Sequence, residues 1–366
     1  MKYKMGRSTH QDVQQSINEA IGELKHPKLI LFFSSVRNFD AYTIGIKEKF
    51  PNCLVIGSTT FASFCKEGIS KEGILVLGIE EGIECYGDVL EEVDQYPIKY
   101  VPRIEACVES IGTSTNTMCL TFTTGLISCE ELVLSTLNSV LNSRQIPIFG
   151  GTAGDEGKAE KTLVSYNGKV YEKACIFVIL KNLGGKIHFY QENIYKPTAH
   201  HFIATKVDVR NRIVYEYDGK PAAPQVAQAL GTDLQHLPSY LDSYPMGRMI
   251  GNDMYITANK EVVEQKGMAY HARVYKNSQM VLLEPDNYKN VIKQTMERIH
   301  QDVPKPSLAL VVHCLARSLL FESQGYLDQF AREMGQTLGN YVGFAGYGEQ
   351  LDHQHFNQTM IIAVFE

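Results

Sequence analysis

The stretch Pro147-Ile-Phe-Gly-Gly-Thr-Ala-Gly-Asp155 decides the fold of this chain. Its three leading apolar residues predict a short buried strand. The glycines that follow predict a tight turn at the end of that strand, because glycine tolerates positive φ and close backbone approach. A turn of this kind can offer bare backbone N–H groups to the anionic part of a ligand.

The chain repeats this pattern twice more. Cys53-Leu-Val-Ile-Gly-Ser-Thr-Thr60 is an apolar run that ends in glycine and hydroxyls, and Tyr341-Val-Gly-Phe-Ala-Gly-Tyr-Gly-Glu349 is an apolar run rich in glycine. Counted from the start of each copy, Asp155 and Glu349 fall at the same offset, directly after a glycine. The first copy has no acid at that offset.

The segments on either side of each copy recur as well. Each copy is preceded by an apolar strand and a helical pattern, and it is followed by another apolar strand. The preceding strands are Leu29–Ser35, Met118–Thr124 and Leu308–Cys314, and the following strands are Gly73–Ile79, Ala174–Leu180 and Thr359–Phe365. We therefore expect an α/β (α+β) protein, with mixed β-sheets built from repeated β-α-β-β units and helices packed on the outside.

Composition excludes several classes of protein. At 366 residues the chain is long enough for two domains, and 44% hydrophobic with 21% charged residues is ordinary for a globular protein. A net charge of −6 argues against a nucleic-acid surface. The polar N-terminus predicts no signal peptide, and no apolar run approaches the roughly 20 residues needed to span a bilayer. We expect a cytoplasmic protein.

The cysteines fit a reducing compartment. None of the eight forms a C-x-x-C pair, and several lie in apolar strand patterns where a thiol acts as a small hydrophobe. The sequence therefore predicts neither disulfides nor a zinc site.

The texture of the chain changes between residues 186 and 284, where strands of alternating character separated by turn signals replace the helical patterns. The stretch from Gly231 to Gly251 has the composition of a linker. We place a domain boundary there, which gives residues 1–231 and 232–366 as the two regions. The last helix is expected over Leu319–Leu338.

Nucleotide and metal motifs are incomplete. Gly157-Lys158 is followed by Ala159 rather than by serine or threonine, so a Walker motif fails, and Gly346-Tyr-Gly348 lacks the third glycine of a dinucleotide fingerprint. His353 and His355 are typical of a solvated turn rather than of a metal site. We expect no cofactor and no metal.

A cysteine nucleophile is one functional hypothesis. Cys314 ends a buried strand and Arg317 follows three residues later, where a cation would lower the pKa of the thiol. His313 is adjacent, but the sequence places no histidine as a base. The alternative is a thiol packed at the end of a strand.

A ligand-binding constellation is the second hypothesis. Arg317 suits a carboxylate, Glu349 and Asp155 suit an ammonium group, and hydroxyls, an amide and glycine N–H groups supply neutral hydrogen bonds. This set fits a zwitterion such as an amino acid; the alternative is an Arg317–Glu349 ion pair that only joins the repeats. The full set of candidate ligand-binding residues is Arg317, Glu349, Asn357, Thr359, Cys314, Gly150, Gly151, Thr152, Asp155, Ser58 and Thr59.

Five motifs in order resemble the FIST domain family, in both its N-terminal and C-terminal regions. They are Pro147–Asp155, Asp218-Gly-Lys-Pro-Ala222, Tyr244-Pro-Met-Gly247, Cys314-Leu-Ala-Arg317, and Gly343-Phe344 through Gly348-Glu349 followed by Asn357-Gln-Thr359. The resemblance covers roughly residue 28 to the end.

The resemblance implies an intracellular sensory module that binds a small ligand, with amino acids the leading candidates, and it transfers no catalytic residues. Because no output domain is visible in the sequence, it also implies a separate signalling partner. An interaction module that binds a partner protein and no small molecule is a third hypothesis.

Overall fold

The computed structural model describes residues 1–112, 115–251 and 253–366. The chain separates into two compact units. The first contains residues 1–191, 295–355 and 360–366, and the second contains residues 192–294 and 356–359. The second unit is thus an insertion into the first, and the predicted boundary between residues 231 and 232 falls inside this insertion.

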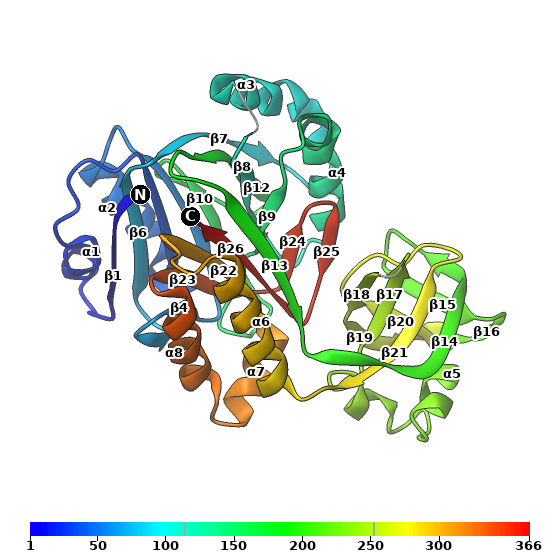
Figure 1. Ribbon diagram of the computed structural model, residues 1–366. Coiled ribbons are helices and arrows are strands. Elements are labelled where there is room, and N and C mark those ends of the chain that lie inside the picture. Colours follow the sequence, from blue (N-terminus) through cyan, green and yellow to red (C-terminus); the bar gives the residue numbers. More distant parts are fainter. Residues whose placement is uncertain (113–114, 252) are drawn as a thin grey trace. The chain divides into compact units, whose positions relative to one another are not determined.

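The first unit consists of three structural repeats (Figure 1). The first repeat contains β1 (Lys2–Ser8), α1 (Val13–Ile21), β2 (Leu29–Ser34), α2 (Phe39–Lys49), β3 (Leu54–Thr59), the hairpin β4 (Ser63–Cys65) and β5 (Gly68–Ser70), and β6 (Ile74–Glu81). The second contains β7 (Ile83–Glu91), α3 (Val101–Ile111), β8 (Thr117–Thr123), α4 (Glu130–Leu141), β9 (Ile148–Thr152), the hairpin β10 (Val164–Tyr166) and β11 (Lys169–Tyr171), and β12 (Ala174–Asn182).

The third repeat follows the same order around the insertion. It contains β13 (Ile187–Asn193), α6 (Tyr288–Asp302), β22 (Leu308–Cys314), α7 (Leu315–Ser323), α8 (Leu327–Leu338), β23 (Tyr341–Gly346), the hairpin β24 (Gly348–Leu351) and β25 (Gln354–Phe356), and β26 (Thr359–Phe365). The single helix expected over Leu319–Leu338 was wrong. The chain forms two helices there, because Gly325 adopts φ +65° between them.

Each repeat builds a six-stranded sheet around a parallel pair. The pairs are β2 with β3, β8 with β9, and β22 with β23, and an antiparallel strand (β6, β12 or β26) flanks the first member. The predicted β-α-β units, each followed by a further strand, are confirmed. The sheet orders are β1-β6-β2-β3-β10-β11, β7-β12-β8-β9-β24-β25 and β13-β26-β22-β23-β4-β5.

These orders show that the hairpins are exchanged in a cycle. The hairpin of the first repeat completes the sheet of the third, that of the third completes the second, and that of the second completes the first. Three backbone hydrogen bonds run in the same cycle: Gly154 N to Thr59 O at 3.0 Å, Phe61 N to Ala345 O at 3.0 Å, and Tyr347 N to Thr152 O at 3.1 Å. They equate Gly154 with Tyr347, so Asp155 corresponds to Gly348 and not to Glu349, as the sequence offset had suggested.

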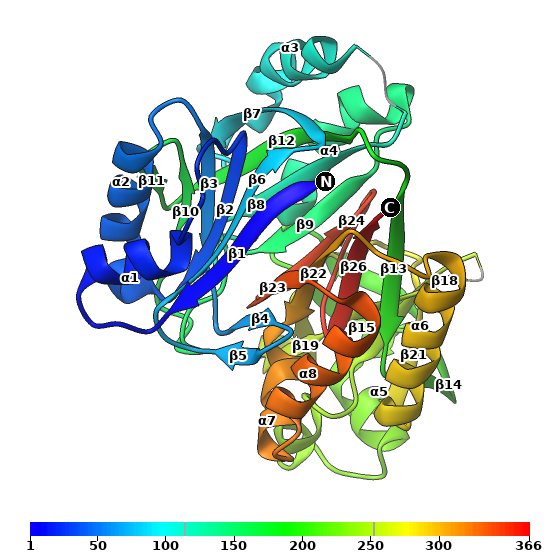
Figure 2. The ribbon, with the colours of Figure 1, turned by 60° about the vertical axis from the view of Figure 1, so that its left-hand side comes forward.

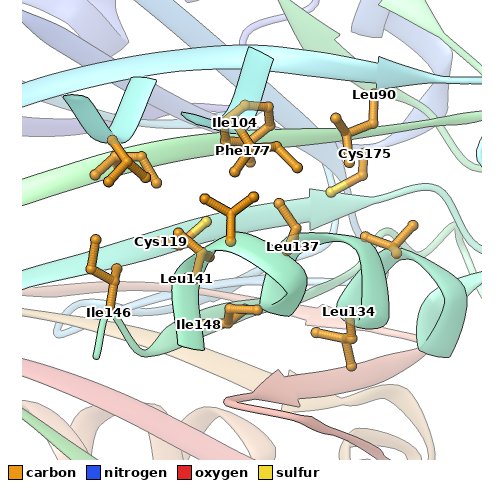
Figure 3. Packing of buried hydrophobic residues seen from close by; sticks show 14 of the residues in the cluster. Leu90, Ile104, Cys119, Leu134, Leu137, Leu141, Ile146, Ile148, Cys175 and Phe177 are labelled. Atoms are coloured by element: carbon orange, nitrogen blue, oxygen red, sulfur yellow. The ribbon is translucent and has the colours of Figure 1, made fainter. Parts of the chain in front are cut away.

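Helices cover the outer faces of the sheets, as predicted. Figure 2 shows α1 and α2 beside the sheet of the first repeat. In the second repeat, Leu137 and Leu141 of α4 and Ile104 of α3 pack with Cys119 and Phe177 of the sheet (Figure 3). This burial is the principal stabilising term for the repeat.

The inner faces of the three sheets meet in an aromatic cluster. The ring centroids of Phe33 and Phe344 are 4.9 Å apart, and Phe122 lies 5.5 Å from each of them. One ring comes from each repeat, so this contact holds the three sheets together at their common centre.

The second unit is an antiparallel sheet with one helix. Its strand order is β18-β17-β21-β14-β15-β20-β19, and β16 pairs with β15. Its elements are β14 (Tyr195–Asp208), β15 (Ile213–Tyr217), β16 (Lys220–Pro221), α5 (Ala222–Ala229), β17 (Met246–Ile250), β18 (Asp253–Thr257), β19 (Asn259–Val263), β20 (Gly267–Tyr270) and β21 (Gln279–Pro285).

Candidate functional site

The carboxyl end of the β22–β23 parallel pair carries the cysteine and arginine singled out in the sequence. Cys314 is the last residue of β22 and the N-cap of α7, with extended backbone (φ −71°, ψ 140°). Arg317 follows in the first turn of α7. In open α/β sheets, ligands bind beyond the carboxyl ends of parallel strands, so this edge is the natural place for a site.

Arg317 is buried, with only 1% of its surface exposed. Its guanidinium carbon lies 5.2 Å from the ring centroid of Phe321 and 5.8 Å from that of Phe330. These cation–π contacts stabilise the charge, yet burying an arginine still carries a large desolvation penalty. A charge kept at this depth is typical of a site that recognises an anion or fixes a specific structure.

His313 faces away from Cys314. Its Nδ1 lies 2.7 Å from Ser318 Oγ, and because that hydroxyl donates to the Cys314 carbonyl oxygen at 3.0 Å, the imidazole is the donor to Ser318. Burial first, and then the charge of Arg317, hold the pKa of His313 well below its usual value, so the ring is neutral. Successive residues of a strand point to opposite faces, so His313 does not serve Cys314 as a base.

Glu349 approaches the same edge from β24. It pairs with Gly151 of β9, and a side chain at Gly151 would meet Val312 Cγ1 of β22 at 2.5 Å. Cross-strand partners share a face, so Glu349 projects toward β22, from which Cys314 projects back on the same face as Val312. Glu349 is fully buried, and β22 and β24 lie against each other.

The glycines of the central motif do not form a turn. Gly150 and Gly151 lie inside β9, which pairs with β8 on one side and β24 on the other. Their backbone groups belong to these two ladders and offer no bare N–H groups to a ligand. A side chain at Gly150 would overlap the carbonyl oxygen of Thr121, so glycine is required for the close approach of neighbouring backbone.

Asp155 organises its own loop. Its carboxylate accepts hydrogen bonds from five successive backbone N–H groups, those of residues 157 to 161, at 2.8 to 3.2 Å, and from the Tyr347 hydroxyl at 2.6 Å. Burial opposes ionisation, but these donors outweigh it and hold the pKa of Asp155 below its usual value. The carboxylate is thus occupied by the protein itself.

The hydroxyls of the first repeat are also committed. Ser58 Oγ donates to the Thr59 carbonyl oxygen at 3.1 Å. Thr59 Oγ1 donates to the Leu163 carbonyl oxygen at 3.2 Å and accepts from its N–H at 2.9 Å, which fixes the exchanged hairpin β10–β11. By contrast, Thr152 Oγ1 is buried without a hydrogen-bond partner in the described part of the chain.

Asn357 and Thr359 belong to the second compact unit. Asn357 N donates to the Ile256 carbonyl oxygen at 3.4 Å within that unit, and both residues are buried. Of the predicted residues, the first unit therefore brings Cys314, Arg317 and Glu349 to the β22 edge.

Two residues important to this region were missed by sequence reasoning. Tyr347 anchors the Asp155 loop, and Ser318 orients His313. An aromatic residue between the glycines of Gly346-Tyr-Gly348 was the available signal for Tyr347. Ser318 stands five residues after His313 and carries no recognisable motif.

Comparison with known proteins agrees with the resemblance. A model of the FIST N domain matches residues 28–220, and a model of the FIST C domain matches residues 222–352. The chain belongs to the FIST family. FIST domains are generally sensory, ligand-binding domains of signal transduction. The FIST protein described here is 27% identical over 404 aligned positions to an uncharacterized protein of Methanocaldococcus jannaschii, covering 97% of this chain and 76% of that relative.

Two further observations bear on the chemistry of this FIST protein. Within residues 1–112, 115–251 and 253–366, no group of three or more His, Cys, Asp or Glu side chains is placed to hold a metal ion. In the same part of the chain, no helix combines the length and apolar character that crossing a membrane requires.

Proposed function

We propose that this FIST protein is an intracellular sensor that binds a small zwitterion, an amino acid in particular, and signals through a separate partner protein. Family membership supports the sensory class. The observation that carries the ligand class is the burial of Arg317, 1% exposed, in the first turn of α7 at the carboxyl end of β22.

The chemistry of this edge suits a zwitterion. The planar guanidinium of Arg317 matches a carboxylate in two parallel hydrogen bonds, and the N-terminus of α7 adds positive potential there. Glu349, buried on β24, supplies the negative charge that an ammonium group needs. The site thus offers groups of both signs to a ligand that carries both.

The phenylalanines beside Arg317 support a desolvated site. Phe321 and Phe330 exclude water from the guanidinium, and the low local dielectric strengthens its attraction for a carboxylate. The same dielectric makes the site selective, because a ligand without a carboxylate would bury the arginine charge with less compensation.

Calorimetry and thermal shift with the common amino acids test this proposal. A ligand present at 100 times its dissociation constant should stabilise the protein by roughly 2.7 kcal/mol. Arg317→Lys keeps the charge but loses the planar fork, so it should weaken or abolish the response. Arg332→Lys, at an exposed i,i+4 ion pair with Asp328, is the matched control and should leave it unchanged.

The proposal fails if no amino acid binds the wild-type protein, or if Arg317→Lys binds as tightly as the wild type while folding normally. A response lost equally in Arg332→Lys would also contradict it, because the effect would then not belong to the buried arginine.

A further inference from the structure

A cavity of about 640 Å³ opens at the carboxyl end of β2, in the first compact unit. Its walls come from four segments far apart in the sequence: residues 9–11, 35–38 and 71–73, and the loop of residues 155–161. The volume lies within the range of small-molecule sites. The cavity is separate from the Arg317 edge and shares none of its lining residues.

One wall of the cavity already holds a carboxylate. Glu156 Oε1 accepts a hydrogen bond from the Val36 backbone N–H at 3.0 Å, across 120 positions of sequence. Asp155 fixes the backbone of the same loop, so the Glu156 side chain is presented to Val36 by a rigid support. The Val36 amide is therefore a carboxylate-binding group that the protein occupies with its own side chain.

Cations surround this amide. Of the lysines and arginine on the wall, Lys71 pairs with Glu322 and Lys161 pairs with Glu172. The remaining two, Arg37 and Lys158, form no ion pair with any described residue. Arg37 directly follows Val36, so a guanidinium stands next to the amide that accepts the carboxylate.

The repeat symmetry provides an independent reason to expect a site here. Ser34 pairs with Thr59 and His313 pairs with Ala345, so Ser35 is the counterpart of Cys314. Both are N-caps with extended backbone, at φ −66°, ψ 166° for Ser35. An arginine follows each cap within three residues. The first repeat thus carries the same backbone feature and the same cation as the third.

We propose that this cavity is a second ligand site, which takes a small carboxylate metabolite. The ligand carboxylate displaces Glu156 from the Val36 N–H and pairs with Arg37, and the loop of residues 155–161 moves with Glu156. Glu156 is thus a built-in competitor, and apparent affinity depends on the fraction of molecules in which it has left the amide.

Calorimetric titration with glutamate, succinate and citrate tests the site. Glu156→Gln preserves the size of the competing side chain but removes its charge, so binding should tighten by about three- to tenfold. Arg37→Gln should weaken binding roughly tenfold, the loss expected for one hydrogen bond to a charged group. Glu160→Gln removes an acid from the same wall without touching Val36, so it serves as the matched control and should change binding less than twofold.

Three results would overturn the proposal. The first is that none of the three carboxylates binds either the wild type or Glu156→Gln. The second is that Glu160→Gln tightens binding as much as Glu156→Gln, which would make the effect one of general charge. The third is that inorganic phosphate binds as tightly as the carboxylates. Binding that persists in Arg317→Lys supports a site independent of the proposed sensor site, and binding lost there assigns the carboxylate to Arg317.

Discussion

The hydroxyl of Tyr347 donates a hydrogen bond of 2.6 Å to Asp155 Oδ1 and accepts one of 3.0 Å from the Ala159 N–H. Tyr347 belongs to the third repeat and Asp155 to the second. Their contact fixes the loop of residues 155–161 relative to the strand that leads into β24, the strand that carries Glu349. The loop and the Arg317 edge are therefore joined by a single short connection.

Removing this hydroxyl should loosen the loop. Tyr347→Phe keeps the ring but deletes a hydrogen bond to a buried carboxylate, which is worth roughly 1.5–3 kcal/mol. Urea unfolding should show a loss of that size, and hydrogen exchange should rise at residues 155–161. Tyr275→Phe, at a side chain that is 47% exposed, is the control and should be neutral. Unchanged exchange in the loop of Tyr347→Phe would show that the backbone N–H groups alone hold Asp155.

The Asp155 carboxylate should make stability depend on pH. Its folded-state pKa is lowered from 3.8, so its contribution is present above that value and is lost as pH falls through the folded-state pKa. Asp155→Asn should therefore be less stable than the wild type at neutral pH, and the difference should shrink under acidic conditions. Denaturant unfolding from neutral pH to about pH 3 measures this difference. A difference that is constant over this range would mean that the charge of Asp155 contributes nothing.

The glycines of β9 should be intolerant of even one methyl group. Gly150→Ala places a methyl group against the Thr121 carbonyl oxygen and forces two backbones apart, which should cost about 1–3 kcal/mol or more. Gly184→Ala is the matched control, since its methyl group would lie 3.4 Å from the nearest atom. Thermal unfolding of the two variants checks the comparison, and equal midpoints would contradict the close-approach role of Gly150.

The sequence predicted the local units of this fold but not their exchange. Apolar strands, helical stripes and the Asn167-Gly168 turn are visible within short windows, so the β-α-β units and the β10–β11 hairpin were found. Pairing of β10 with β3 joins residues more than 100 positions apart. No local pattern specifies that partner.

The candidate site shows the same limit. Residue type identified Asp155 and the glycines as unusual, but the partners that define their roles, Tyr347 and Thr121, lie in other strands or repeats. Glycine was interpreted as a turn former because a sequence shows permitted φ angles and not close backbone approach. Arg317 and Glu349 were found because a buried charge is uncommon in an apolar segment.

Cysteine labelling separates the sensor from a cysteine-dependent enzyme. Burial raises the pKa of Cys85 and Cys107 to about 11, yet these two are the partly exposed thiols among the eight. Cys314 is 3% exposed and His313 points to the other face of β22. Since the thiolate is the reactive form and needs access, iodoacetamide at neutral pH should modify Cys85 and Cys107 slowly and Cys314 least.

Mass spectrometry of the labelled protein measures this order, and labelling in urea is the control, because all eight thiols should then react. The α7 N-terminus and Arg317 both favour a thiolate at Cys314, so burial must prevail for the thiol to stay inert. Fast and selective modification of Cys314 in the folded protein would show that these charges prevail instead. The edge of β22 would then hold a nucleophile, and the enzyme hypothesis would replace the sensor.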